Sequence, residues 1–315
     1  MEQIYIRTIQ FEAWWEKMVF ERLSRGWYLT KLSFSIINQE KKLLLLPIIS
    51  GISLIAVVLS FIIPLVGVFI WWPSLLNNNT AFSIFYYVMY FVFYLVTYFV
   101  GVFFNSALIH MATVKLQGGH PTIGEGLRKA GENIGLIFKW ALLAATVGLI
   151  LNAIQQKAGF IGRIIIGFIG AAWSIAIYFV VPVIIYEKQS GFGAVKRSIQ
   201  IMRNTWGEAL GGGLGMGIIF FLLALIGVVL LFVGIYAAIA MGSLWIFVGF
   251  LLGTIFYWLF LAILASAAHG VLVAALYRYA VTGQLSPGFQ QSIYSNPWAG
   301  QQVNQAPNYN APRPY

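Results

Sequence analysis

The chain has 315 residues, of which 60% are hydrophobic and only 9% are charged, and its mean hydropathy is +0.83. A soluble domain carries about a quarter charged residues, so this composition excludes a protein that folds in water alone. The sequence contains no cysteine and no aspartate, which excludes disulfide bonds, thiolate catalysis and cysteine-based metal sites. The net charge of +10 is better explained by basic residues beside membrane spans than by a nucleic-acid partner.

Residues 1–22 are predicted to form an amphipathic helix rather than a secretory signal peptide. Phe11, Trp14, Trp15 and Met18 are interleaved with Glu and Lys residues, and this spacing places the large apolar groups on one helical face. Such a helix either lies in the headgroup layer of a membrane or packs on the protein surface. Translation from Met18 instead of Met1 is an alternative, because the first copy of a repeat begins just after Met18.

Six apolar stretches are long enough to cross a bilayer, which takes about 20 residues of helix. The expected fold class is therefore an all-α membrane protein with six transmembrane helices. The predicted spans cover about residues 43–72, 81–116, 134–154, 161–186, 210–239 and 244–279. The second stretch is longer than the hydrocarbon core requires, so it must tilt, bend or extend beyond the membrane. Pro47 and Pro64 are expected to kink or end the first helix, and Pro182 lies in the last turns of the fourth.

Local signals indicate where helices start and where they pack. Thr122 with Glu125, and Thr205 with Glu208, have the spacing of a capping box, which predicts a helix start just after each threonine. Glycines four residues apart in the last two spans have the small-xxx-small spacing that permits close helix packing, within the chain or between subunits. These pairs are Gly207/Gly211, Gly211/Gly215, Gly213/Gly217 and Gly249/Gly253.

A pattern recurs three times along the chain and predicts a repeated unit, a basic amphipathic helix on the membrane surface followed by a transmembrane hairpin. When Gly26, Ala130 and Ser198 are aligned, the residue before each is basic and the eighth residue after each is aromatic. The aligned basic residues are Arg25, Lys129 and Arg197, and the aligned aromatic residues are Phe34, Phe138 and Trp206. The predicted domain organisation is an interfacial helix at 1–22, a six-span domain at 23–282 and a disordered tail at 283–315.

The distribution of charge predicts the orientation of the spans. Sixteen Lys and Arg residues fall on the side of the two termini and of the loops after spans two and four. Only two, Lys157 and Arg163, fall on the other side, and Lys139 is ambiguous. By the positive-inside rule, both termini are expected in the cytoplasm. The predicted location is the inner (plasma) membrane of a prokaryote.

Two groups of residues are candidates for function. The first is a set of basic residues on the three surface helices, expected to contact anionic lipid headgroups or a partner. It comprises Arg25, Lys31, Arg128, Lys129, Lys196, Arg197 and Arg203. The second is a set of polar residues within spans, Asn105, His110 and His269, which either line a path or form interhelical hydrogen bonds. An ion pair between Glu187 and Arg197 is expected at the end of the fourth span.

The sequence offers no arrangement of residues for catalysis or for a cofactor. Its three histidines are far apart and have no Cys or Asp companions, so they make a poor set of metal ligands. No Ser-His-acid set, pair of acids or glycine-rich phosphate loop occurs at a credible depth. We therefore expect a protein that is not an enzyme and that holds no metal or cofactor.

Four stretches resemble a prokaryotic family of six-span membrane proteins whose function is uncharacterised. They are ERLSRGWYLTKLSFSIINQEKKLLLLPIISG, QGGHPTIGE at Gln117–Glu125, PVIIYE at Pro182–Glu187 and AVKRSIQIMRNTWGEAL. The resemblance covers about residues 20–283. More distantly, the order of span end, acidic residue, glycine and basic surface helix is similar to the membrane domain that accompanies some glycerophosphodiester phosphodiesterases. That similarity implies a fold and no activity, because the catalytic domain of those enzymes has no counterpart here.

The leading functional hypothesis is a non-enzymatic scaffold that organises lipids or partners through a basic cytoplasmic face. Homo-oligomerisation through the glycine faces is expected with it. The alternative is a transporter or channel for an unidentified solute, which uses the repeat interface and the three intramembrane polar residues. The tail at 283–315 is either inert or a binding segment for a cytoplasmic partner.

Overall fold

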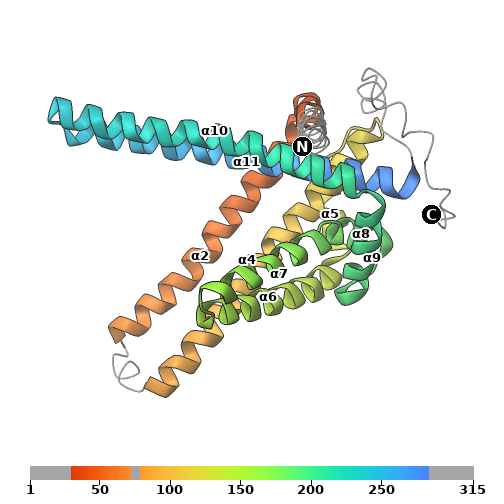
Figure 1. The fold of residues 1–315 in the computed structure, drawn as a ribbon, viewed down its shortest axis with the longest axis horizontal. Coiled ribbons are helices and arrows are strands. Elements are labelled where there is room, and N and C mark those ends of the chain that lie inside the picture. The colour runs from red at the N-terminus through yellow and green to blue at the C-terminus, as the bar shows by residue number, and fades with distance from the viewer. Residues whose placement is uncertain (1–29, 72–78, 284–315) are drawn as a thin grey trace, which may run out of the picture. The chain divides into compact units, whose positions relative to one another are not determined.

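The computed structural model describes residues 30–71 and 79–283 of the chain (Figure 1). All regular secondary structure within these ranges is helical. The predicted interfacial helix at 1–22, Arg25 and the predicted tail beyond Gly283 lie outside the described residues.

The described chain consists of short and long helices. Residues 30–39 are helical, and a 3-10 helix, η1 (Lys41–Leu44), leads into the first long helix. The further elements are α2 (Leu45–Trp71), α4 (Asn79–Leu116), α5 (Ile123–Gly131), α6 (Ile134–Lys157), α7 (Phe160–Ala176), α8 (Val180–Glu187), α9 (Gly191–Asn204), α10 (Trp206–Met241) and α11 (Leu244–Thr282). The ends of these helices lie within a few residues of the predicted span ends. Apart from a break inside the fourth span, the largest difference is at the start of α10, predicted near Leu210 and observed at Trp206.

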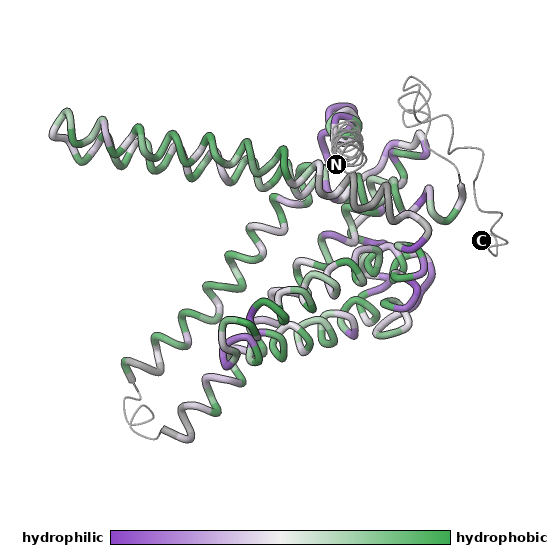
Figure 2. Tube along the Cα trace, in the orientation of Figure 1, coloured by the Kyte–Doolittle hydropathy of each residue, from purple (hydrophilic) through white to green (hydrophobic). Residues whose placement is uncertain are grey.

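Within residues 30–71 and 79–283, six segments are long and apolar enough to cross a membrane. They are Lys41–Gly67, Ser83–Leu116, Ile134–Lys157, Phe160–Glu187, Gly215–Met241 and Leu244–Thr282. Their surfaces expose large apolar side chains, for example Phe160 and Trp245, which are 80% and 83% exposed. Hydrophobic residues cover most of the long helices, whereas hydrophilic residues gather on α9 and near helix ends (Figure 2). Apolar surface of this extent requires lipid around it, so the chain is a multi-pass membrane protein.

The described helices form two compact units. The first unit combines residues 30–44 with the hairpin of α10 and α11, and the second unit contains α2 to α9. In the second unit α4 is the central element, because α2, α5, α6 and α8 all pack against it. The helix α9 packs against α6, α7 and α8, so this amphipathic helix contacts the hairpin that precedes it in the sequence.

The two prolines of the first span do not end its helix. Pro47 lies in the first turn of α2, where a missing N–H removes no helical hydrogen bond. The helix then continues through Pro64 to Trp71. Of the two predicted effects of these prolines, termination of the helix is therefore wrong.

The fourth span is interrupted, whereas the sequence predicted one continuous helix. The helix α7 ends at Ala176, and α8 begins at Val180. Pro182 explains the position of the break, since it has no N–H to donate to the carbonyl of Tyr178 and its ring would clash with that carbonyl. The proline therefore lies in the first turn of a new helix rather than inside a long one.

One of the two predicted capping boxes is confirmed. The N–H of Glu125 donates to the Thr122 hydroxyl (3.2 Å), and the N–H of Thr122 donates to Glu125 Oε2 (2.9 Å). The hydrogen bond from the backbone of Thr122 holds the pKa of the Glu125 carboxyl below its usual value, because it stabilises the charged form. At the second position the predicted helix start is confirmed, because α10 begins directly after Thr205, but the Thr205 side chain makes no capping hydrogen bond.

The hairpin of α10 and α11 is tightly packed at two glycines that the spacing rule did not select. A side-chain carbon at Gly227 would overlap the indole of Trp258, and one at Gly234 would overlap Phe250. The same indole donates from Nε1 to the carbonyl oxygen of Ala224 at 3.2 Å. Glycine at these two positions thus lets the aromatic side chains of α11 reach the backbone of α10.

The predicted packing glycines Gly217, Gly249 and Gly253 have open space where a side chain would lie. Close packing within the described chain is therefore wrong for these three residues. A contact between subunits at the same glycines stays a prediction.

Gly234→Ala should destabilise the hairpin, because the added methyl group overlaps Phe250 and overpacking of this kind costs about 1–3 kcal/mol. Gly253→Ala is the matched control, since its methyl group meets no atom and alanine favours a helix by roughly 1 kcal/mol. Thermal unfolding of the detergent-purified protein should show a lower midpoint for Gly234→Ala only. Equal midpoints for the two variants would contradict the close contact.

Candidate membrane-surface site

The helix α5 carries its most exposed cation on the side away from the protein. Gly126 is buried, and a side chain there would lie 3.0 Å from the carbonyl oxygen of Ala107, so α5 rests directly on α4. Arg128 is exposed. Lys129 is half-buried, and its Nζ lies 3.6 Å from Glu132 Oε2, a surface pair that contributes little to stability.

The helix α9 has two different faces. Its inner face is buried and includes Ala194, Val195, Ser198, Ile201 and Met202. Its outer face carries Phe192, Lys196, Ile199 and Arg203, all exposed and spaced by four, three and four residues. This spacing aligns the four side chains along one side of the helix. We call them the α9 stripe.

The α9 stripe alternates apolar and basic groups. Phe192 is 70% exposed and Ile199 is 41% exposed, although both are large hydrophobic residues. Lys196 and Arg203 form no ion pair with any residue in 30–71 or 79–283, so both charges are available to an external anion. Exposed apolar groups beside unpaired cations are typical of a helix that lies at a membrane interface.

The predicted ion pair between Glu187 and Arg197 is confirmed. Arg197 Nε donates to Glu187 Oε2 at 2.7 Å, and the two side chains are 21% (Glu187) and 17% (Arg197) exposed. The bond joins the end of α8 to the middle of α9. Arg197 therefore holds α9 in place. The sequence pattern predicted a headgroup contact for Arg197 together with the exposed cations, but its guanidinium is already paired. Lys31 is exposed on the helix at residues 30–39 of the first unit.

Ser198 satisfies the backbone at the break in the fourth span. The N–H of Phe179, the residue before α8, donates to Ser198 Oγ at 3.0 Å, and both residues are fully buried. In a continuous helix this N–H would donate to the carbonyl of Ile175. An unpaired N–H within a membrane costs several kcal/mol, so the break depends on the inner face of α9.

A further set of polar contacts connects the end of α8 to the junction of α5 and α6. Lys188 Nζ donates to Asn133 Oδ1 at 2.6 Å, and Asn133 Nδ2 donates to the carbonyl oxygen of Lys129 at 2.7 Å. None of the hydrogen bonds of Asn133, Lys188 and Ser198 is predicted by the sequence pattern. The signal for Ser198 was its place at the aligned position of the repeat, where Ala130 is also buried.

The intramembrane polar candidates are divided between the two units. His110 of α4 lies 3.3 Å from the hydroxyl of Tyr186 in α8, measured from Nδ1, so it makes an interhelical hydrogen bond. Asn105 is half-buried on the same helix, whereas His269 belongs to α11 of the other unit. Within the ranges that the structure describes, no three His, Cys, Asp or Glu residues are placed to hold a metal ion.

The fold and this surface define an all-helical, multi-pass membrane protein with an amphipathic helix fixed beside its spans. A family model matches residues 84–288, more than half of the chain, and describes a family of unknown function, DUF6159. The chain belongs to this family, which agrees with its resemblance to an uncharacterised family. No curated protein matches the sequence. The more distant similarity to the membrane domain of some glycerophosphodiester phosphodiesterases stays a prediction.

Ser198→Ala should loosen α9 and the start of α8, because the N–H of Phe179 loses its acceptor at a cost of about 1–3 kcal/mol. Ser174→Ala is the control, since that exposed hydroxyl only donates to Gly170 of its own helix. Hydrogen exchange of the purified protein should become faster in α8 and α9 for Ser198→Ala and stay unchanged for Ser174→Ala. The assignment fails if both variants exchange like the wild type.

Proposed function

We propose that this protein is a non-enzymatic membrane scaffold that gathers anionic lipid beside its helical domain. The observation that carries the proposal is the α9 stripe, two cations and two apolar side chains on one outward face. The inner face of the same helix is fixed by the bonds of Ser198 and Arg197. The stripe is therefore held ready for lipid before any lipid binds, which lowers the entropy lost on binding.

The chemistry of the stripe matches the two layers of a membrane interface. Phe192 and Ile199 suit the boundary with the acyl chains, and Lys196 and Arg203 suit the phosphates of the headgroups. Each basic residue near an anionic membrane surface contributes about 1 kcal/mol. Arg128 of α5 is a third exposed cation in the same unit.

The proposal includes the orientation and the internal repeat. The excess of basic residues on the side of the termini supports a cytoplasmic location for both ends, in the inner membrane of a prokaryote. The order of α5 before α6 and α7, and of α9 before α10 and α11, supports a repeat of surface helix and hairpin. Association of copies through Gly249 and Gly253, and a cytoplasmic partner for the tail, complete the proposal.

Lys196→Gln combined with Arg203→Gln should lower the ratio of anionic to zwitterionic phospholipid that co-purifies with the protein. The loss of two surface charges weakens headgroup attraction by about 2 kcal/mol. Lys157→Gln combined with Arg163→Gln is the matched control, because it removes the same charge at the far end of α6 and the start of α7. Lipid mass spectrometry measures the ratio. An unchanged ratio in the first variant, or an equal fall in both, would refute the proposal.

Single cysteines test the orientation, because the natural chain has none. A membrane-impermeant maleimide should label Lys157→Cys in intact cells and should label Lys196→Cys only after the membrane is permeabilised. Both positions are exposed, so a difference in labelling reports the side of the membrane rather than burial. The reverse pattern would place the α9 stripe outside the cell and contradict the proposed face.

A transporter or channel is the second candidate, and the interruption of the fourth span favours it. Broken helices line the binding sites of many transporters. In this alternative Asn105, His110 and His269 line the path. The test is solute flux into liposomes that contain the purified protein. Flux that is lost in His269→Ala would support a transporter, and the absence of flux would support the scaffold.

A further inference from the structure

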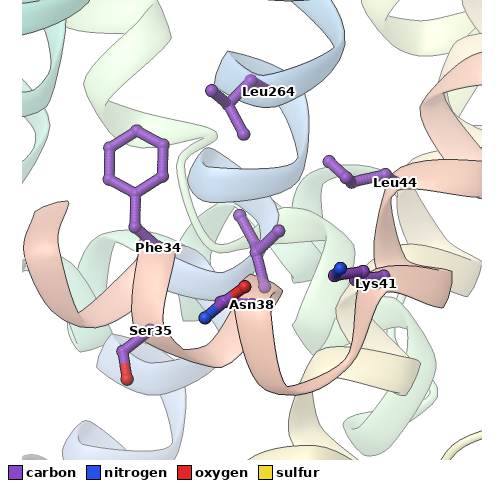
Figure 3. Close-up of a pocket in the computed structure, with 7 residues that line it drawn as sticks. Phe34, Ser35, Asn38, Lys41, Leu44 and Leu264 are labelled. Atoms are coloured by element: carbon purple, nitrogen blue, oxygen red, sulfur yellow. The ribbon is translucent and has the colours of Figure 1, made fainter.

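We propose that a groove in the first unit binds the headgroup of one anionic phospholipid. The groove has a volume of about 460 Å³ and lies between the helix at residues 30–39, η1 and α11 (Figure 3). This volume is within the range of about 300–1,000 Å³ that is usual for small-ligand sites. The inference rests on the proposed function, because both concern anionic lipid, and it names a defined site for a single molecule.

The lining of the groove has an apolar side and a polar side, which are separated in the view of Figure 3. The apolar side chains are Phe34, Ile37, Leu44 and Leu264. The polar side chains are Ser35, Asn38 and Lys41. A site with this division fits an amphiphile better than it fits a fully polar solute or a hydrocarbon chain.

Lys41 supplies the positive charge of the groove. The neighbouring Lys42 lies 3.9 Å from Glu40, whereas Lys41 is exposed and forms no ion pair with a described residue. The amide of Asn38 and the hydroxyl of Ser35, which accepts a hydrogen bond from Gln39 at 3.4 Å, are hydrogen-bond donors that line the same groove. One cation with two neutral donors fits a phosphodiester, which has a single negative charge and several acceptor oxygens.

The groove lies at the depth where headgroups are expected. Leu264 is ~30 Å along α11 from its first residue, Leu244, and this is the thickness of the hydrocarbon core. The large exposed apolar side chains of α11 end at Phe260, and a run of buried residues begins at Ala267. On the other wall, Lys41 is the first residue of a candidate span. Two independent elements therefore place the groove at the boundary between acyl chains and headgroups.

The walls of the groove are held by packing within the unit. The ring of Phe34 contacts that of Phe220 in α10, with centroids 5.9 Å apart. Ile37, which also lines the groove, and Leu43 of η1 are buried, at 4% and 0% exposed. The phosphate of a bilayer lipid can thus lie against Lys41 while its first acyl carbons cover Phe34 and Leu264, in a site that is already formed.

Native mass spectrometry of the delipidated, full-length protein tests the inference with phosphatidylglycerol and phosphatidylcholine as probes. The wild type should bind one phosphatidylglycerol more tightly than phosphatidylcholine. Lys41→Gln should weaken phosphatidylglycerol about fivefold and leave phosphatidylcholine unchanged. Leu264→Trp should abolish this binding, because the indole fills the groove.

Matched controls lie beside each variant. Lys42→Gln removes a charge that is already near Glu40, and Leu259→Trp enlarges a side chain that is 55% exposed on the same helix. Both should bind phosphatidylglycerol like the wild type. Unchanged binding in Leu264→Trp, or an equal loss in Leu259→Trp, would overturn the groove as the site.

Two further experiments distinguish a bound phospholipid from other occupants of the groove. A photoreactive residue in place of Leu264 should cross-link to phospholipid; a cross-link to residues 1–29 or to a second copy would overturn the inference. Displacement of the lipid by millimolar inorganic phosphate would indicate a site for free phosphate and would also overturn it. In one outcome, the double variant Lys196→Gln with Arg203→Gln lowers co-purified anionic lipid while Leu264→Trp binds phosphatidylglycerol normally. That result would refute the groove as a lipid site and would support the proposed function. If the wild type enriches no anionic lipid, both fail.

Discussion

A membrane allows no backbone N–H to remain without a partner, and the fourth span meets this requirement only because α9 lies against it. Pro182 interrupts the helix and separates Phe179 from its usual acceptor. Ser198 Oγ of α9 accepts a hydrogen bond from that N–H at 3.0 Å. A second contact between α8 and α9 is the ion pair of Glu187 and Arg197, whose Oε2 and Nε atoms are 2.7 Å apart. The position of the amphipathic helix is therefore set by a backbone requirement inside the span.

Because the N–H of Phe179 needs an acceptor, the two faces of α9 have different roles. The inner face is occupied by bonds to the fourth span, so the helix cannot turn to present a different side without exposing Ser198 and Arg197. The outer face, with Lys196 and Arg203, is left to the surroundings. A surface helix held only by apolar packing could rotate or slide at little cost, whereas directional hydrogen bonds fix its register. The lipid contact that we propose for the outer face thus depends on polar contacts of the inner face.

Much of the fold could be predicted, because span position depends on local composition. Apolar runs of about 20 residues predict membrane helices whatever their neighbours are. The capping box of Thr122 and Glu125 could be predicted for the same reason, since both of its hydrogen bonds are local. The break before Pro182 could not, because a proline near a predicted span end fits either the last turn of one helix or the first turn of another. The choice depends on Ser198, a residue of a different helix.

The glycines show the same limit of sequence reasoning. A spacing of four identifies one face of a helix, but it does not indicate which face meets a neighbour. In the α10–α11 hairpin the decisive feature is a large aromatic residue on the partner helix, as at Gly234 and Phe250, and that pairing depends on the register of the two helices.

Register also affects the predicted repeat. Phe34 lies in a separate helix that ends before Glu40, whereas the aligned Phe138 lies within the long helix α6.

The same backbone argument separates the two functional candidates. A transporter that uses a broken helix leaves the freed backbone groups open to its substrate. Here the freed N–H of Phe179 is bonded within the chain, and both Phe179 and Val180 are fully buried. His110 likewise bonds to Tyr186 of a neighbouring helix. Lys41, Lys196 and Arg203, in contrast, are exposed and form no ion pair with a described residue. These contacts favour the proposed binding of lipid headgroups over a solute path that uses the broken helix.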